Sequence, residues 1–258
     1  MTSDTVTRRS RRLPRSAFTE LFKVQARLSL RERYIYVGIV LPFGLLVVFW
    51  GISENVSGTV AGTGLTVLDL WIPTILVTCY ITLALLNLPQ TFARDREIGW
   101  LRRVSTTPVP PLWLLTAQLL LNLIVAGIVT AVVVVVGAAL FGAPLSVGIL
   151  FVGVAILAIA EVYSLGLIVA AIAPSQQGGV YIAGGLFYPL LFLSGLWIQP
   201  VQVGGALEQI MWYSPAGAPT RALLYSVFNV APPYATLVTM GVYTVIFVLV
   251  AVRYFRWE

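Results

Sequence analysis

Long stretches without a charged residue dominate the pattern of apolar and polar positions along the chain. Five of them cover residues 34–53, 70–93, 104–160, 162–207 and 222–252. A transmembrane helix needs about 20 predominantly apolar residues, and a charge at mid-bilayer costs about 2.5 to 3.5 kcal/mol. The 57-residue stretch is long enough for more than one span, with a turn at Phe141–Pro144, and a polar, glycine-containing run at 174–179 breaks the apolar run after Glu161.

This pattern predicts an all-α membrane protein with six transmembrane helices. We expect them near Ile35–Ile52, Leu70–Leu88, Leu112–Leu140, Val147–Ala173, Val180–Trp197 and Leu237–Val252. Helices are favoured over the strands of a membrane barrel, because runs such as Val132–Val136 lack the alternation of barrel strands.

Composition excludes a water-soluble protein and several kinds of catalyst. Of the 258 residues, 59% are hydrophobic and 10% are charged, whereas soluble domains carry roughly 25% charged residues. The chain has no histidine, and its one lysine, Lys23, lies outside any glycine-rich run, so it lacks a phosphate-binding loop of the Walker type. We therefore expect no cofactor or metal on this chain, and we expect any ATP and Mg²⁺ to be bound by a partner.

The basic residues predict the orientation. Nine of the sixteen Lys and Arg residues precede the first span, four lie between spans two and three, and two follow span six, which leaves Arg221 alone on the other side. By the positive-inside rule, both termini are cytoplasmic. Residues 1–34 read as a basic tail and an amphipathic helix on the membrane surface, because apolar residues share one arc and Lys23, Arg27 and Arg31 the opposite one. Residues 35–258 form the six-span domain.

The cytoplasmic segment 94–108 between spans two and three is dense in charges of both signs. It reads as a short helix that ends before Pro108, Pro110 and Pro111. A helix of about 10 to 14 residues is marginal alone in water, so it needs either the membrane surface or a partner protein to hold it. Both interpretations stay open on these grounds.

The same segment carries a motif that resembles the permease subunits of type-2 ATP-binding-cassette exporters. The matching residues are Asp95, Glu97, Gly99, Leu101, Thr107 and Pro108, and the likeness extends over the whole chain, with more similarity to the drug-resistance branch. It implies that 94–108 is a coupling helix that contacts a cytoplasmic ATPase. Trp100, Arg102 and Arg103 belong to this implied coupling segment but depart from the commoner Thr-Leu-Glu version, so the polarity of the docking surface is not carried over.

Segment 200–233 matches the re-entrant helical hairpin that the resemblance implies between spans five and six. Prolines and glycines cut it into pieces too short to cross a bilayer, and Ser214-Pro215 resembles the family's Ser or Asn followed by Pro. Glu208 and Arg221 flank the turn. They are candidates for an ion pair, with two unrelated interfacial charges as the alternative.

Glu161 falls near the middle of span four, where an ionisable group is costly and usually functional. Candidate partners are Asn122 on span three and Thr78 on span two. Two roles stay open: a protonated, hydrogen-bonded side chain that holds spans together, or a group that handles substrate or protons.

The resemblance implies a bacterial plasma (inner) membrane exporter for an amphipathic drug, lipid or glycoconjugate. Two permeases, as a homodimer or a heterodimer, would assemble with two ATPase subunits in the lipid bilayer, with no nucleic acid involved. The alternative is a self-sufficient six-span carrier or channel with Glu161 as its ion-linked group. An intramembrane enzyme ranks last, because no paired carboxylates or metal ligands are evident.

Overall fold

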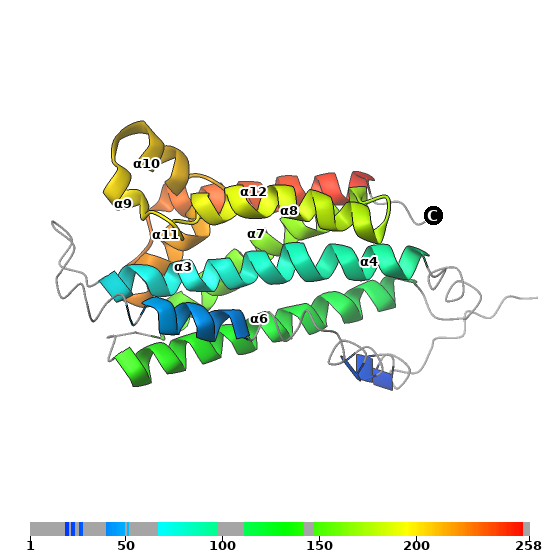
Figure 1. Cartoon of the computed structure of the whole chain (residues 1–258), viewed down its shortest axis with the longest axis horizontal. Coiled ribbons are helices and arrows are strands. Elements are labelled where there is room, and N and C mark those ends of the chain that lie inside the picture. Colours follow the sequence, from blue (N-terminus) through cyan, green and yellow to red (C-terminus); the bar gives the residue numbers. More distant parts are fainter. Residues whose placement is uncertain are drawn as a thin grey trace, which may run out of the picture.

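The computed structural model describes residues 40–49, 51, 67–97, 111–141 and 147–254, together with the pairs 19–20, 22–23 and 26–27. All regular structure in these residues is helical, which confirms the all-α class (Figure 1). The helices are Val40–Phe49, α3 (Val67–Thr82), α4 (Leu88–Glu97), α6 (Pro111–Phe141), α7 (Ile149–Ile172), α8 (Gln176–Leu193), α9 (Pro200–Val203), α10 (Gly205–Trp212), α11 (Gly217–Val227) and α12 (Tyr234–Tyr254). A single π-helical turn, η1 (Leu83–Asn87), joins α3 to α4.

Four helices are long and apolar enough to cross a membrane, within the residues described. They are Leu70–Arg94, Ala117–Ala139, Ile149–Ile172 and Tyr234–Tyr254, and they coincide with the predicted spans two, three, four and six. Predicted span five is represented by the 18-residue α8, whose first turn is polar. Predicted span one is described as a helix over Val40–Phe49.

Span two continues further than its apolar run suggests. The prediction ends it at Leu88, whereas the helix runs on through α4 to Glu97. The π turn η1 ends at Asn87, two residues before Pro89. A proline ring in a regular α-helix clashes with the carbonyl four residues earlier, and the wider π turn gives that carbonyl room. The helix therefore passes Pro89 and carries Arg94–Glu97 beyond the apolar segment.

The α3–η1–α4 rod is the centre of the bundle. In the most apolar stretch of this rod 89% of the residues are buried, compared with 28% for α6 and 17% for α12. Many of the exposed side chains of α6 and α12 are apolar. Helix α12 packs along α7, α6 packs along α3, and α4 packs against α8. Helix α7 approaches the rod very closely at Gly166, where a Cβ atom would collide with the backbone carbonyl of Ala84. Small residues permit such contacts between membrane helices.

The three short helices α9, α10 and α11 gather at one end of the bundle, and the C-terminal end of α4 lies at the other (Figure 1). Gln199, just before α9, attaches this end to span two, because its side-chain amide donates to Thr74 Oγ1 at 3.2 Å and to the Leu70 carbonyl at 3.5 Å. The predicted hairpin segment 200–233 thus consists of helices of 4, 8 and 11 residues, each too short to cross a bilayer.

Candidate functional site

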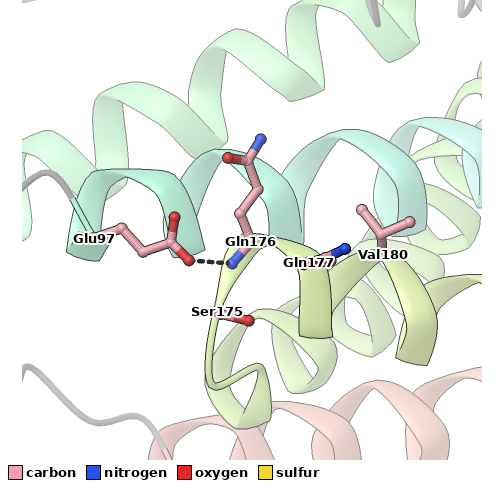
Figure 2. A pocket seen from close by; sticks show the side chains of 5 residues that line it. All are labelled: Glu97, Ser175, Gln176, Gln177 and Val180. Atoms are coloured by element: carbon pink, nitrogen blue, oxygen red, sulfur yellow. Dashed lines mark hydrogen bonds between the residues drawn. The ribbon is translucent and has the colours of Figure 1, made fainter.

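The end of α4 contacts the beginning of α8 through Glu97. Its Oε1 accepts a hydrogen bond of 2.8 Å from the backbone N–H of Gln176, the first residue of α8 (Figure 2). Glu97, Gln176, Ser175, Gln177 and Val180 line a cavity of about 420 Å³ at this junction. Residues 79 positions apart in the chain are therefore joined at the end of the bundle opposite α9–α11.

Local sequence explains why α8 begins at this point. Ser175 has an extended backbone, with φ −151° and ψ 167°, and its side-chain oxygen accepts from the N–H of Gly178 at 3.0 Å, so it caps the helix. Glu97 accepts from a second of the amides that have no partner within the helix. A carboxylate at a helix N-terminus also interacts favourably with the helix dipole, by about 0.3 to 1 kcal/mol at an exposed site.

Of the predicted coupling residues, the structure describes the side chain of Glu97. Asp95 lies in the last turn of α4, and nothing is described of its side chain. The other residues predicted for this segment lie outside the described part of the chain: Gly99, Trp100, Leu101, Arg102, Arg103, Thr107 and Pro108.

Asn122 belongs to a buried polar layer inside the bundle. Its Oδ1 accepts from Asn87 Nδ2 at 3.1 Å, and its own Nδ2 donates to the Gln118 carbonyl at 2.9 Å. The hydroxyl of Tyr163 donates to the Asn122 backbone carbonyl at 3.2 Å, and Thr91 bonds the Asn87 carbonyl at 3.1 Å. These contacts connect spans two, three and four, so Asn122 is a bonded packing residue.

Glu161 is fully buried in α7. Neither of its carboxyl oxygens has a hydrogen-bond partner among the residues described, and the hydroxyl of Thr78 is likewise buried without one. The expected hydrogen bonds from Glu161 to Asn122 and Thr78 are therefore not formed in this conformation. An unpartnered polar group in an apolar interior is costly, and Glu161 places an ionisable one inside the bundle.

Ser214 and Pro215 form the turn between α10 and α11. Ser214 Oγ donates to the Met211 carbonyl at 2.8 Å and accepts from the Gly217 N–H at 2.9 Å. A Cβ atom on Gly217 would collide with that same carbonyl. The Ser214-Pro215 motif is thus a compact turn. Within it the Ser214 hydroxyl bonds both a backbone acceptor, the Met211 carbonyl, and a backbone donor, the Gly217 N–H.

Glu208 and Arg221 are connected through an aromatic residue. The indole N–H of Trp212 donates to Glu208 Oε1 at 3.1 Å, and the Arg221 guanidinium carbon lies 5.5 Å from the Trp212 ring centre and 5.6 Å from that of Tyr213. Within the described residues, the two charges form no ion pair with each other. The pairing considered from the sequence is replaced here by contacts of both charges with Trp212.

Sequence reasoning missed Ser175, Gln176 and Trp212 as parts of these sites. The run at 174–179 is interpreted from the sequence only as a break between spans, although a serine followed by a helical run signals a helix N-cap. Among the described residues, no group of three or more His, Cys, Asp or Glu side chains is arranged to hold a metal ion.

Comparison with known proteins shows the family. The family model for the ABC-2 type transporter matches residues 16–228, which is most of the chain. No curated protein matches the chain significantly. The match includes segment 94–108, the bundle core and most of segment 200–233. The chain therefore belongs to the ABC-2 type transporter family and is a transmembrane component of an ABC transporter.

Proposed function

We propose that the chain is the permease subunit of an ATP-driven exporter, with six spans and cytoplasmic termini. Its energy comes from a separate ATPase, which holds ATP and Mg²⁺ and docks on segment 94–108. The observation that carries this proposal is the hydrogen bond from Gln176 to Glu97, because it connects the start of that segment to a second membrane helix. Membership of the ABC-2 family supports the ATPase context.

The contacts suggest how a displacement is transmitted. Helix α4 is continuous with the buried rod of span two, and Glu97 at its end is bonded to α8. A movement of segment 94–108 therefore acts on two helices together. Nucleotide state shifts an inward-facing to outward-facing equilibrium only if the ATPase contacts the two states differently, so this junction has to move with the docked partner.

Helix α8 also supports an export path between two permease copies, identical or different. Its exposed side chains include Gln177, Tyr181 and Tyr188, and the Gln177 amide donates to the Tyr181 hydroxyl at 3.4 Å. Polar groups are disfavoured against hydrocarbon, so this face suits a partially hydrated path better than lipid. A face with both rings and hydroxyls fits an amphipathic drug, lipid or glycoconjugate, exported across a bacterial plasma membrane as in the drug-resistance branch.

Substitution of Glu97 tests the proposal in the complex with its co-purifying ATPase. Glu97→Ala removes the acceptor for Gln176, whereas Glu97→Gln retains an acceptor oxygen without the charge. We expect about a tenfold loss of ATP-driven efflux of a fluorescent amphipathic dye for the first and a smaller loss for the second. Gln176→Ala is the matched control, because it shortens the neighbouring side chain and keeps the backbone N–H that donates to Glu97. Normal coupling in Glu97→Ala would refute the role of this junction.

Docking on the segment itself requires a second test. Charge reversal at Arg102 and Arg103 is expected to disassemble the complex or to uncouple ATP hydrolysis from efflux, measured by co-purification and by ATPase activity. An intact complex with normal efflux would show that the ATPase docks elsewhere.

A self-sufficient carrier with Glu161 as its ion-linked group is the second candidate. It is favoured by one observation, the fully buried carboxyl group without a hydrogen-bond partner among the described residues. Such a carrier requires no ATPase, so the purified chain in proteoliposomes would move solute against its gradient. Glu161→Gln separates the two candidates, because a carrier would lose transport and its pH profile, whereas the ATP-driven exporter is expected to keep both.

A further inference from the structure

A cavity of about 400 Å³ lies between the outer end of α3 and the hairpin helices, far from the Glu97 junction. Its volume is within the roughly 300 to 1,000 Å³ of small-molecule sites. Two charged residues, Glu208 from α10 and Arg221 from α11, contribute to its wall. Most of the remaining wall is apolar, with Leu70, Leu224 and Phe228 among its residues. The cavity thus combines two opposite charges with an apolar surface.

Arg221 is oriented by aromatic contacts and keeps hydrogen-bonding capacity. Its guanidinium lies over the Trp212 and Tyr213 rings at 5.5 and 5.6 Å. Its Nη1 is buried and has no hydrogen-bond partner among the residues described. A buried guanidinium nitrogen without an acceptor is costly, whereas a phosphate or carboxylate oxygen forms a strong, charge-assisted bond with it. Arg221 therefore supplies a positively charged hydrogen-bond donor for an anionic group.

Glu208 limits which anions fit. Its Oε1 accepts from Trp212 Nε1 at 3.1 Å, which orients the carboxylate in the cavity wall without neutralising it. A ligand with negative charge alone would be repelled by this carboxylate, and a ligand with positive charge alone would be repelled by Arg221. Because these two residues form no ion pair with each other in the described part of the chain, each is available to a ligand that carries both charges.

We propose that this cavity binds the headgroup of a zwitterionic phospholipid, with the phosphate on Arg221, the amine on Glu208 and the start of the acyl chains on the apolar wall. A lipid is favoured over a free phosphate ester because most of the cavity wall is apolar, and the hairpin is proposed to lie at the outer membrane surface. This site does not depend on ATP coupling, so it goes beyond the proposed transport function and is tested without the ATPase.

Lipid adducts of the purified full chain, counted by native mass spectrometry, test the headgroup. We expect phosphatidylethanolamine to bind about tenfold more tightly than phosphatidylglycerol, which has a phosphate but no amine. Its advantage over diacylglycerol, which has no headgroup charge, should be larger than about tenfold. O-Phosphoethanolamine shares the headgroup but lacks acyl chains, and we expect it to bind weakly. Equal binding of O-phosphoethanolamine and the lipid would overturn the lipid assignment, and equal binding of the lipid and diacylglycerol would overturn the headgroup site.

Three variants assign the contacts. Arg221→Gln is expected to weaken phosphatidylethanolamine binding about tenfold, and Arg253→Gln, an exposed arginine at the opposite end of the bundle, should leave binding unchanged. Glu208→Gln should remove the preference over phosphatidylglycerol while the chain still binds both. This second variant keeps the proposal falsifiable if Arg221→Gln does not fold. Unchanged binding in a folded Arg221→Gln protein, or an unchanged preference in Glu208→Gln, would overturn the proposal.

Discussion

The indole nitrogen of Trp212 lies 3.1 Å from Oε1 of Glu208, one helical turn earlier in α10. Trp212 is almost fully buried, and the face of its ring also contacts the Arg221 guanidinium. One aromatic side chain therefore orients two opposite charges of the α10–α11 hairpin, through a hydrogen bond at its edge and a cation–π contact at its face. The arrangement explains why the hairpin holds both charges without an ion pair between them.

Substitution of Trp212 separates these two contacts. Trp212→Phe keeps a ring near Arg221 but loses the donor to Glu208, so we expect the free energy of unfolding to fall by about 0.5 to 1.5 kcal/mol plus a small packing loss. Trp212→Ala also leaves a cavity, and we expect a loss of about 3 to 5 kcal/mol. Denaturation of the purified protein in mixed micelles measures both. Trp197→Phe is the control, because Trp197 is exposed, and equal losses at the two tryptophans would contradict the assignment.

Gly166 should be intolerant of any side chain. Gly166→Ala places a Cβ atom against the carbonyl of Ala84, which belongs to the backbone and cannot turn aside, so we expect a loss of about 1 to 3 kcal/mol in the free energy of unfolding. Gly153→Ala on the same helix is the matched control, since a Cβ there meets no atom within 4 Å. Denaturation midpoints compare the two variants. A neutral Gly166→Ala would show that α7 and η1 are not in such close contact.

The bond between Asn87 and Asn122 should appear as an energetic coupling between the spans. Each single substitution by leucine leaves one buried amide without its partner, and we expect a loss of about 0.6 kcal/mol, the average for hydrogen bonds between membrane helices, and at most about 1.7 kcal/mol. The double substitution removes both amides, so its cost should be less than the sum of the two. Unfolding free energies of the four proteins measure the coupling, and strict additivity would count against a direct bond.

The orientation of the bundle can be checked with single cysteines. Cys79 is fully buried, so a Cys79→Ser background leaves no native thiol. Gln209→Cys in α10 and Gln177→Cys in α8 replace exposed residues near opposite ends of the bundle. In intact cells we expect an impermeant maleimide to label the cysteine at position 209 only, and broken cells should allow labelling at both positions. The reverse pattern would invert the proposed topology.

Prediction from the sequence succeeded where one local property decides the structure. The apolar runs at Leu112–Leu140 and Val147–Ala173 became α6 and α7 within a few residues at each end. The prediction was less accurate at the end of span two. The helix continues through Pro89 because of a π turn, and local composition does not predict such a turn. The side-chain contacts of Glu161 could not be predicted from the sequence either. Candidates at similar depth in the bilayer can be named from a sequence, but contact depends on how each helix is rotated.

The amino-acid sequence by itself determined the membrane location, the helical class and the family, because the cost of exposing charge or unpaired backbone to hydrocarbon follows from local composition, and the family motif is a linear pattern. Only the tertiary structure decided that Glu97 meets Gln176, that Asn122 bonds Asn87, and that Trp212 stands between Glu208 and Arg221. These contacts depend on the register and rotation of packed helices, which are set by the interlocking of many side chains at once.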